Sequence, residues 1–266
     1  MIKTDDFRYM WRGQIEQILP KQDAYRLAPV VIEKQKHDRA LLLLHGFSST
    51  PAVYRLMIPK LTSYDGILCP VLPGHGETIE AFSLAKAKDW LRATEHAYQQ
   101  LKKTYAQVDV MGISLGGLLG CHLAKNHPIH HLYLLNPALA LKTSRKASLG
   151  LTHILHALGL STIPNRAGNL HTREHFELTY RKLPLATIIE ILTLIGTPVD
   201  LPRCPTDLFL GVFDKVVDVK KVSEIFKGLP NIHTHWLHNS AHVLPLDGDV
   251  EEILQCVNQN NHDLMA

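Results

Sequence analysis

The stretch Val108-Asp109-Val110-Met111-Gly112-Ile113-Ser114-Leu115-Gly116-Gly117 joins a short apolar run to the pattern Gly-x-Ser-x-Gly. Helical spacing continues to Lys125, so the stretch reads as a strand, a tight turn that carries Ser114, and a helix. Such a turn holds the serine in a strained conformation and crowds the flanking backbone, which Gly112 and Gly116 tolerate. The helix start favours negative charge beside the serine. Gly-x-Ser-x-Gly also occurs in ordinary glycine-rich turns, but its place between strand and helix makes Ser114 a candidate nucleophile.

The length of 266 residues fits one large α/β domain, with or without an insertion, or at most two small domains. Hydrophobic residues make up 45% of the chain, which is enough for a sizeable core. A net charge of +3 without a dense Lys/Arg cluster gives no reason to expect nucleic acid as a partner. We see no signal-peptide pattern and no apolar run of membrane-spanning length, and the four scattered cysteines favour free thiols. We therefore expect a cytoplasmic monomer or homodimer without integral membrane contact.

Histidine is abundant, with 17 residues, but its spacing does not predict a metal site. The closest groupings are His130-His131, His153 with His156, and His171 with His175. The last pair has the i, i+4 spacing of a helix face but lacks an acidic residue or a third ligand. The sequence therefore predicts neither a metal ion nor an organic cofactor.

Apolar runs alternate with helical patterns along most of the chain. This alternation predicts an α/β fold with a mostly parallel central sheet and helices on both faces. The expected strands lie at 27–31, 40–44, 66–72, 108–113, 131–135, 207–212 and 232–237, and the expected helices at 51–62, 84–105, 118–125, 218–227 and 248–259. Residues 1–24 show no clear periodicity.

Residues 139–200 break the alternation. They contain no strand-like run, but helical patterns occupy about 148–158 and 183–195, and the second has an apolar stripe that a neighbour must cover. Ordinary core packing would also explain such a stripe. Because the segment follows a strand end beyond Ser114, we expect a small helical cap over a substrate pocket. The predicted division is a core of residues 1–138 and 201–266 with a cap insertion at 139–200.

Two further loops carry the residues that a serine nucleophile needs. Serine requires a base within hydrogen-bond reach and a third group to orient that base. Loops at the carboxyl ends of parallel strands lie side by side. The sequence places Asp214 directly after the strand 207–212 and His242 several residues beyond the strand 232–237. We predict a catalytic triad of Ser114, Asp214 and His242.

Other residues compete for the acid and base roles. His238, at the end of the same strand, is the alternative base, whereas His233 and His235 fall inside the strand pattern. Asp218 is the alternative acid, but its position fits the N-cap of the next helix. Taken alone, an aspartate such as Asp214 after a strand is more commonly a simple turn residue.

An oxyanion hole requires two backbone N–H groups directed at the developing negative charge. Leu115 supplies one because it follows the nucleophile directly. His45-Gly46 lets the loop after the strand 40–44 turn tightly and present the N–H of Phe47. We predict that Phe47 and Leu115 form the oxyanion hole.

The chain resembles the α/β-hydrolase superfamily, and within it the small-capped bacterial carboxylesterases and monoacylglycerol lipases. The resemblance runs from about residue 38 to 257. It rests on Leu43-Leu44-His45-Gly46-Phe47, Pro73-Gly74-His75-Gly76, Gly112–Gly117, Asp214 with Val216-Val217, Ser240-Ala241-His242-Val243, and Tyr180 with Leu183-Pro184 and the helix after them. Ala241 stands where glycine is usual in the family, and the cap before residue 175 matches no pattern that we can place.

The resemblance implies a serine hydrolase that forms an acyl-enzyme on Ser114 and needs no cofactor. The expected partner is a small-molecule ester with a hydrophobic acyl group, such as a medium-chain ester or a monoacylglycerol. The same triad also serves thioesterases, acyltransferases and hydrolases of carbon–carbon bonds. A non-catalytic binding protein with this fold is a further alternative, although such proteins usually lose a triad residue and all three are present here.

Overall fold

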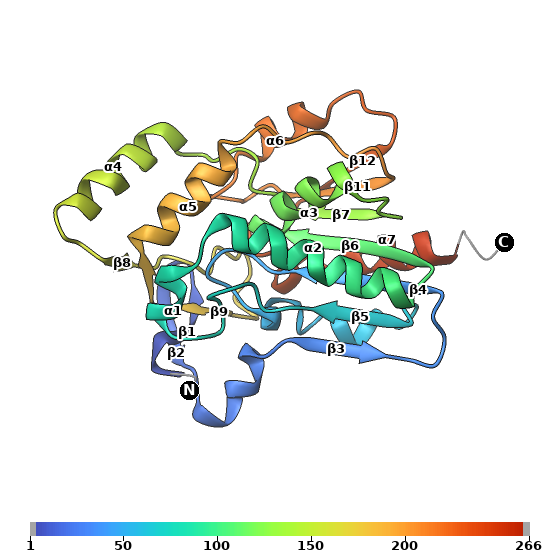
Figure 1. Ribbon diagram of the computed structural model, residues 1–266, viewed down its shortest axis with the longest axis horizontal. Helices are drawn as coiled ribbons and strands as arrows, with labels where there is room; N and C mark the ends of the chain where they lie inside the picture. The colour runs from blue at the N-terminus through green and yellow to red at the C-terminus, as the bar shows by residue number, and fades with distance from the viewer. Residues whose placement is uncertain (1–3, 263–266) are drawn as a thin grey trace.

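The computed structural model describes residues 4–262, and in this part of the chain a seven-stranded sheet forms the centre of the molecule (Figure 1). The strand order is β12-β11-β7-β6-β4-β5-β3, and only the β3–β5 pair is antiparallel. The strands are β3 (Val30–Glu33), β4 (Arg39–Leu44), β5 (Gly66–Cys69), β6 (Gln107–Ile113), β7 (Leu132–Leu135), β11 (Thr206–Gly211) and β12 (Ile232–Leu237). The predicted mostly parallel sheet is confirmed.

Helices cover both faces of this sheet, as the continuous apolar strands require. Alternate residues of β4 pack into two different cores: Leu42 lies in a core shared with α2 (Ala87–Thr104), α3 (Leu115–Asn126) and α6 (Val219–Phe226). Leu41 and Leu43 lie in the other core, with α7 (Val250–His262) and the 3₁₀ turns η3 (Pro51–Tyr54) and η4 (Ile58–Lys60). None of the helices in the described residues is both long enough and apolar enough to cross a bilayer.

Several predicted elements have different bounds in the structure. The helix expected at 51–62 is instead the two short turns η3 and η4, and Pro59 lies in the first turn of η4. The helix expected at 84–105 is split, because Ala85 and Lys86 are extended between α1 (Ile79–Leu84) and α2. The strand expected at 27–31 begins at Val30, since Leu27 ends the 3₁₀ helix η2 (Lys21–Leu27).

The expectation that residues 139–200 contain no strand is wrong. This segment holds the helices α4 (Arg145–Ala157) and α5 (Leu185–Ile195), but also β8 (Thr162–Pro164), β9 (Glu177–Tyr180) and β10 (Lys182–Pro184). β10 pairs with β8, and β9 pairs with the N-terminal strand β1 (Phe7–Trp11), which in turn pairs with β2 (Gln14–Ile18). Strands of three or four residues are too short to show an alternating pattern, and their partners lie far away in sequence.

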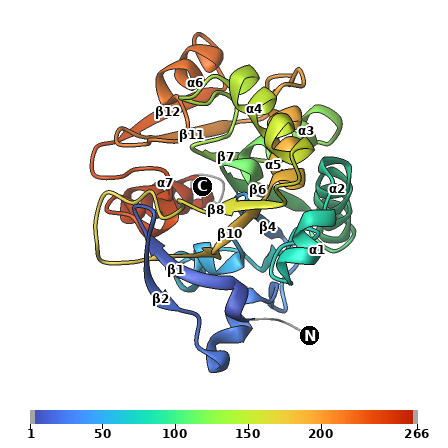
Figure 2. The ribbon, with the colours of Figure 1, turned by 90° about the vertical axis from the view of Figure 1, so that its left-hand side faces the viewer.

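Figure 2 shows the N-terminal hairpin β1–β2 and the strands β8 and β10 at the end of the molecule where the carboxyl ends of the parallel strands lie. The short helix η1 (Thr4–Asp6) precedes β1. The N-terminal residues thus pair with the insertion rather than with the central sheet. We retain the division into a core of 1–138 and 201–266 and a cap of 139–200 as a proposal, with the hairpin as a support for the cap.

Candidate active site

Ser114 occupies a sharp turn between β6 and α3. Its φ of +53° and ψ of −113° lie outside the regions that non-glycine residues normally adopt, and it is the N-cap residue of α3. A Cβ at Gly112 would overlap the backbone of Gly116, and a Cβ at Gly116 would overlap the carbonyl of Leu44. The two glycines therefore permit the close approach that the sequence pattern predicts.

Asp214 and His242 form a direct ion-pair contact at the carboxyl ends of β11 and β12. Asp214 Oδ2 lies 2.7 Å from His242 Nδ1. The other oxygen, Oδ1, accepts the N–H groups of Val216 and Val217 at 2.6 and 2.8 Å. Because both oxygens of this buried carboxylate are held, its orientation toward the imidazole is fixed.

The environment of His242 stabilises its charged form. Burial by itself lowers the pKa of this imidazole, but the charge of Asp214, the hydrogen bond to it and the charge of Glu177 all raise it. The net result is a pKa above the ordinary value of 6.5. A base of this kind takes a proton readily and holds the resulting imidazolium beside two carboxylates.

The loop after β4 runs beside Ser114, and its Phe47 lines the same cavity as the serine. Gly46 lies close to the serine, since a Cβ built on it would contact Ser114 Cβ at 3.6 Å. In the part of the chain that the structure describes, no acceptor takes the N–H of Phe47 or that of Leu115. Two unused backbone donors on either side of a serine are what an oxyanion hole requires.

Two buried histidines hold this loop. His45 Nε2 accepts the N–H of Leu72 at 3.0 Å, and His75 Nε2 accepts the N–H of Ser48 at 3.2 Å. Both must be neutral to accept, and burial lowers the pKa of His45 to about 4 and that of His75 well below its ordinary value. The motif Pro73-Gly74-His75-Gly76 therefore anchors the backbone that carries Phe47.

A cavity of about 330 Å³ opens onto Ser114 and His242. Its wall is largely apolar, and α5 contributes Ile191, Leu192 and Ile195 from the predicted apolar stripe. Further apolar side chains come from Phe47, Leu141, Leu183 and Val216. Part of the predicted stripe thus lines the cavity beside Ser114, and the role of this segment as a cap over a substrate pocket stays a prediction.

Three polar side chains at this site were missed by the sequence analysis. Asn136, at φ +43°, donates from Nδ2 to the carbonyls of Ala241 and His242 and accepts the N–H of Gly211. Asp247 accepts the N–H of Ala241 at 2.8 Å and those of two residues in the cap segment. Glu177, buried in β9, lines the cavity and accepts the N–H of Gly168. Of the three, only Asn136 had a signal in the sequence: the pair Asn136-Pro137 directly follows the expected strand 131–135.

The competing residues lie elsewhere. Asp218 accepts the N–H of Lys221 and caps α6, as predicted. His238 is exposed beyond β12 and does not line the cavity, whereas His235 binds Asp207. Among the described residues, the group with metal-ligand geometry, formed by Asp207, His235 and Cys256, lies at the opposite end of the sheet.

Comparison with known proteins agrees with this geometry. The family described as "Alpha/beta hydrolase family" matches residues 41–255. The chain belongs to the alpha/beta hydrolase family. The α/β-hydrolase fold expected from the sequence is therefore confirmed.

Two named relatives of this alpha/beta hydrolase are esterases or lipases. The thermostable monoacylglycerol lipase of Bacillus sp. strain H-257 is 30% identical over 225 residues, which is 81% of this chain and 87% of that protein. The carboxylesterase of Bacillus subtilis strain 168 is 25% identical over 228 residues, covering 83% and 91%. A solved structure from a study of the metagenome-derived lipolytic enzymes LipS and LipT has a TM-score of 0.79 at 23% identity, with 90% and 98% coverage.

Proposed function

We propose that this chain is a serine carboxylesterase that hydrolyses esters with a hydrophobic acyl group, such as medium-chain esters or monoacylglycerols. The observation that carries the proposal is the 2.7 Å Asp214–His242 contact, with the imidazole lining the same apolar cavity as the strained Ser114. The two named relatives, a monoacylglycerol lipase and a carboxylesterase, support the same reaction class. Fold alone would not specify it.

In the proposed reaction, Ser114 Oγ attacks the ester carbonyl while His242 Nε2 takes its proton. The carbonyl oxygen becomes negative and is stabilised by the N–H groups of Phe47 and Leu115. The tetrahedral intermediate then collapses, and the alcohol leaves with the proton from His242. Water, deprotonated by His242, attacks the acyl-enzyme in the same way and releases the carboxylic acid and the free serine.

Asp214 has two roles in this scheme. Its Oδ2 accepts the Nδ1 proton of His242, which leaves the Nε2 lone pair free to act as the base. Its negative charge then stabilises the imidazolium that each proton transfer creates. No metal or organic cofactor takes part in any step.

The cavity supports the choice of substrate class. Its volume of about 330 Å³ is at the lower end of typical small-molecule sites, and its lining is mainly apolar. An acyl chain gains free energy by leaving water for such a surface, at about 25 cal/mol per Å². A short or medium acyl chain therefore fits this site better than a charged or strongly polar one.

The test is hydrolysis of p-nitrophenyl esters from acetate to palmitate and of a monoacylglycerol series, with Ser114→Ala as the paired variant. We expect activity that peaks at one chain length and falls to background in the variant. Activity that survives in Ser114→Ala would show that Ser114 is not the nucleophile. If a folded protein cleaves no ester but cleaves acyl thioesters, the thioesterase alternative replaces the proposal.

A second reagent separates an enzyme from a binding protein. A fluorophosphonate reacts with a serine only where a base activates it. We expect covalent labelling at Ser114, located by mass spectrometry of the peptide, and no labelling in His242→Ala. An unlabelled wild-type protein would favour the non-catalytic alternative.

The cellular setting is part of the same proposal. All four cysteines are free thiols in the structure, and Cys69 and Cys121 are buried. This supports a reducing, cytoplasmic location. Analytical ultracentrifugation would distinguish the monomer from the homodimer.

A further inference from the structure

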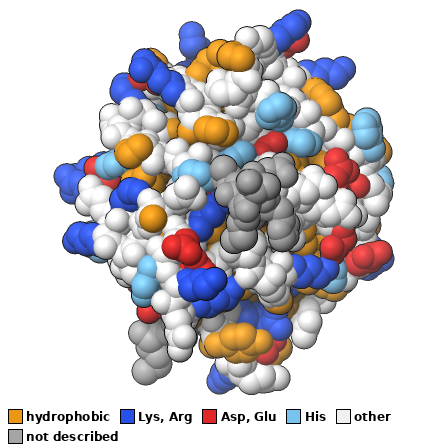
Figure 3. All heavy atoms as spheres, turned by 90° about the vertical axis from the view of Figure 1, so that its right-hand side faces the viewer, with side chains coloured by type: hydrophobic (Ala, Val, Ile, Leu, Met, Phe, Trp, Pro, Cys, Tyr) orange, Lys and Arg blue, Asp and Glu red, His pale blue; other side chains and the backbone are white. Residues whose placement is uncertain are grey.

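A cluster of potential metal ligands lies at the amino ends of the strands, opposite the cavity. Asp207 is the second residue of β11, His131 immediately precedes β7, and His235 lies on the adjacent strand β12. Cys256 approaches from α7, which covers this face of the sheet. The four residues are widely separated in sequence, so no metal-binding spacing motif predicts the cluster. Figure 3, which views this end of the molecule, shows several histidine side chains close to an acidic one.

The distances within the cluster are short. Asp207 Oδ1 lies 2.6 Å from His235 Nε2, and Oδ2 lies 2.7 Å from His131 Nε2. Cys256 Sγ lies 3.8 Å from His235 Nε2. One ligand atom each from Asp207, His235 and Cys256 falls within 4.8 Å of the other two. Atoms bound to one tetrahedral zinc ion at about 2.0–2.3 Å lie roughly 3.3–3.8 Å apart, so side-chain shifts of about 1 Å would suffice.

The surroundings hold the ligand atoms in place. The ring of His131 stacks on Tyr133 with centroids 4.5 Å apart, and the ring of His235 stacks on Phe209 at 4.6 Å. The side chain of Asp207 is only 6% exposed, whereas that of His235 is 28% exposed. The carboxylate is therefore buried, and the partly exposed imidazole gives an ion a way in.

The amide of Asn260 marks the point on which these groups converge. Its Nδ2 lies 2.8 Å from Asp207 Oδ2, 3.4 Å from His131 Nε2 and 3.8 Å from Cys256 Sγ. A partly positive NH₂ group thus faces an oxygen, a nitrogen and a sulfur atom at once. A cation that binds Asp207 and Cys256 would displace this amide and take its place.

We propose that Asp207, His235 and Cys256 form a binding site for one divalent transition-metal ion, best matched by Zn²⁺, and that His131 holds the Asp207 carboxylate in position. An imidazole, a carboxylate and a thiolate are all ligands that zinc accepts, and a water molecule in the fourth position completes its tetrahedral geometry. On binding, Cys256 releases its thiol proton to solvent. His235 Nε2 donates its proton to Asp207 in the metal-free protein, so on binding this proton leaves to solvent, Nδ1 takes one from solvent, and the Nε2 lone pair binds the ion.

The position of the site indicates a structural role. It joins β11, β12 and α7 at one end of the sheet, and the loops after β11 and β12 carry Asp214 and His242 at the other end. An ion that binds only the folded chain stabilises it in proportion to the logarithm of the ion concentration over Kd. The proposal is independent of the esterase function, because no cavity residue takes part.

The experiment uses the full-length, untagged, metal-stripped protein with Zn²⁺ and Co²⁺ as probes. Equilibrium dialysis should show one zinc ion per chain, and Co²⁺ should give a thiolate-to-cobalt charge-transfer band. At free zinc 100-fold above Kd, Tm should rise by about 5 °C or more. Less than one equivalent of retained zinc, with no change in Tm, would overturn the proposal.

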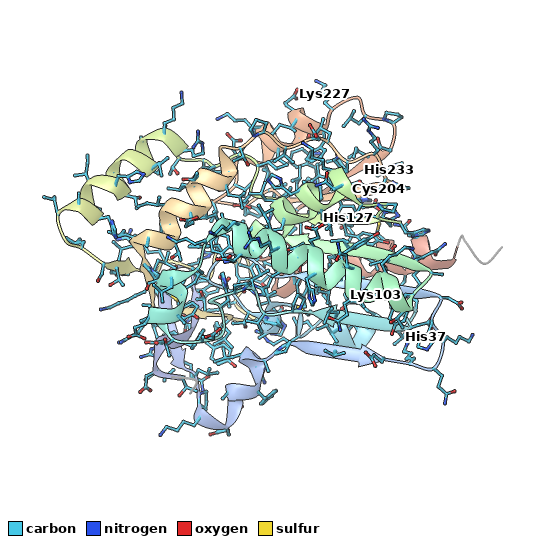
Figure 4. The ribbon with its side chains drawn as sticks, viewed as in Figure 1. His37, Lys103, His127, Cys204, Lys227 and His233 are labelled. Carbon is cyan, nitrogen blue, oxygen red and sulfur yellow. The ribbon has the colours of Figure 1, made fainter. Side chains whose placement is uncertain are left out.

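Matched variants locate the site. Cys256→Ser and His235→Gln should weaken zinc binding at least about 10-fold. Cys204→Ser and His233→Gln should bind zinc like the wild type, since both residues lie near the amino ends of β11 and β12 but outside the cluster (Figure 4). Equal zinc affinity in all four variants would place the ion elsewhere and contradict the proposal.

A measurement on the wild type covers the case in which a variant does not fold. Iodoacetamide modification, followed by mass spectrometry, should slow at Cys256 when zinc is added and stay unchanged at Cys204, because only a thiolate bound to the metal is protected. Equal rates at Cys256 with and without zinc would overturn the proposal.

Discussion

The side-chain amide of Asn136 donates a hydrogen bond of 3.1 Å to the main-chain carbonyl of His242. The same Nδ2 donates to the carbonyl of Ala241 at 2.8 Å, and Oδ1 accepts the N–H of Gly211 at 3.0 Å. Asn136 is fully buried after β7, between β6 and β11. One side chain thus ties the loop that carries the proposed base to the end of the strand that leads to Asp214.

Replacing Asn136 with alanine should lower kcat by about 10- to 100-fold, because a displacement of the imidazole by about 1 Å is enough for a loss of this size. The variant also leaves the N–H of Gly211 unpaired, which costs about 1–3 kcal/mol of unfolding free energy. Steady-state kinetics and urea denaturation measure the two effects.

The matched control for Asn136→Ala is Asn231→Ala. Asn231 likewise donates from Nδ2 to two carbonyls, those of Pro202 and Cys204, but at the far end of the sheet. The Asn231→Ala variant should have a free energy of unfolding lowered by a similar amount and an unchanged kcat. An equal fall in kcat in both variants would show that Asn136 acts through general stability rather than by positioning His242.

Glu177→Gln should move the acidic limb of the kcat/KM profile to lower pH. Activity requires neutral His242, so it falls as the pH drops through the pKa of that imidazole. The negative charge of Glu177 helps to raise this pKa. Removing the charge lowers the pKa, and the base stays neutral to a lower pH. The profile is measured with a short-chain p-nitrophenyl ester.

The exposed Glu174, three residues earlier, provides the comparison for Glu177. Glu174→Gln makes the same chemical change away from the cavity and should leave the acidic limb unmoved. A shift of the limb to higher pH in Glu177→Gln would contradict the electrostatic account of His242.

Most of the central sheet was predictable, because most of its inner strands are largely apolar runs and end in loops with glycine, proline or histidine. β4, with all six residues buried, is the clearest example. The elements that sequence reasoning missed are held by distant partners: β9 is four residues long, and its pairing with β1 joins Phe7 to Tyr180. No local pattern contains that information.

The same distinction between local pattern and distant contact holds for the proposed triad and the residues around it. Ser114, Asp214 and His242 each come after a strand of the parallel sheet, and this geometry predicts that they share one edge. Asp214 contacts His242, and Ser114 and His242 line the same cavity. Glu177, in β9, acts on His242, and Asp247 accepts the N–H groups of His171 and Thr172. The partners are far away in sequence, and a single acidic residue carries no signal of such a contact. The roles of Glu177 and Asp247 became visible only when burial and hydrogen-bond partners were known.

Gly116→Ala should destabilise the protein strongly and abolish activity. The added Cβ would overlap the carbonyl of Leu44, so the start of α3 must move away from β4. Overpacking of this kind typically costs about 1–3 kcal/mol, and here it also displaces Ser114. Denaturation and esterase assays on the same preparation report both effects.

Gly150→Ala is the opposite case and the control for Gly116→Ala. Gly150 lies inside α4, and a Cβ there would meet no atom within 4 Å. Alanine should therefore stabilise the helix by about 0.5–1 kcal/mol and leave activity unchanged. Destabilisation by Gly150→Ala would show that α4 packs more tightly than the structure indicates.

His45 makes the stability of the fold depend on pH. Burial lowers its pKa to about 4, against an ordinary value of 6.5. Between pH 6.5 and 4 the unfolded chain binds a proton that the folded chain does not, so stability falls as the pH falls, by roughly 3 kcal/mol over this window. His45→Gln should remove this contribution and flatten the slope of unfolding free energy against pH, measured by urea denaturation. The exposed His153→Gln should keep the wild-type slope. If His45→Gln keeps it too, His45 is not the neutral acceptor that holds the N–H of Leu72.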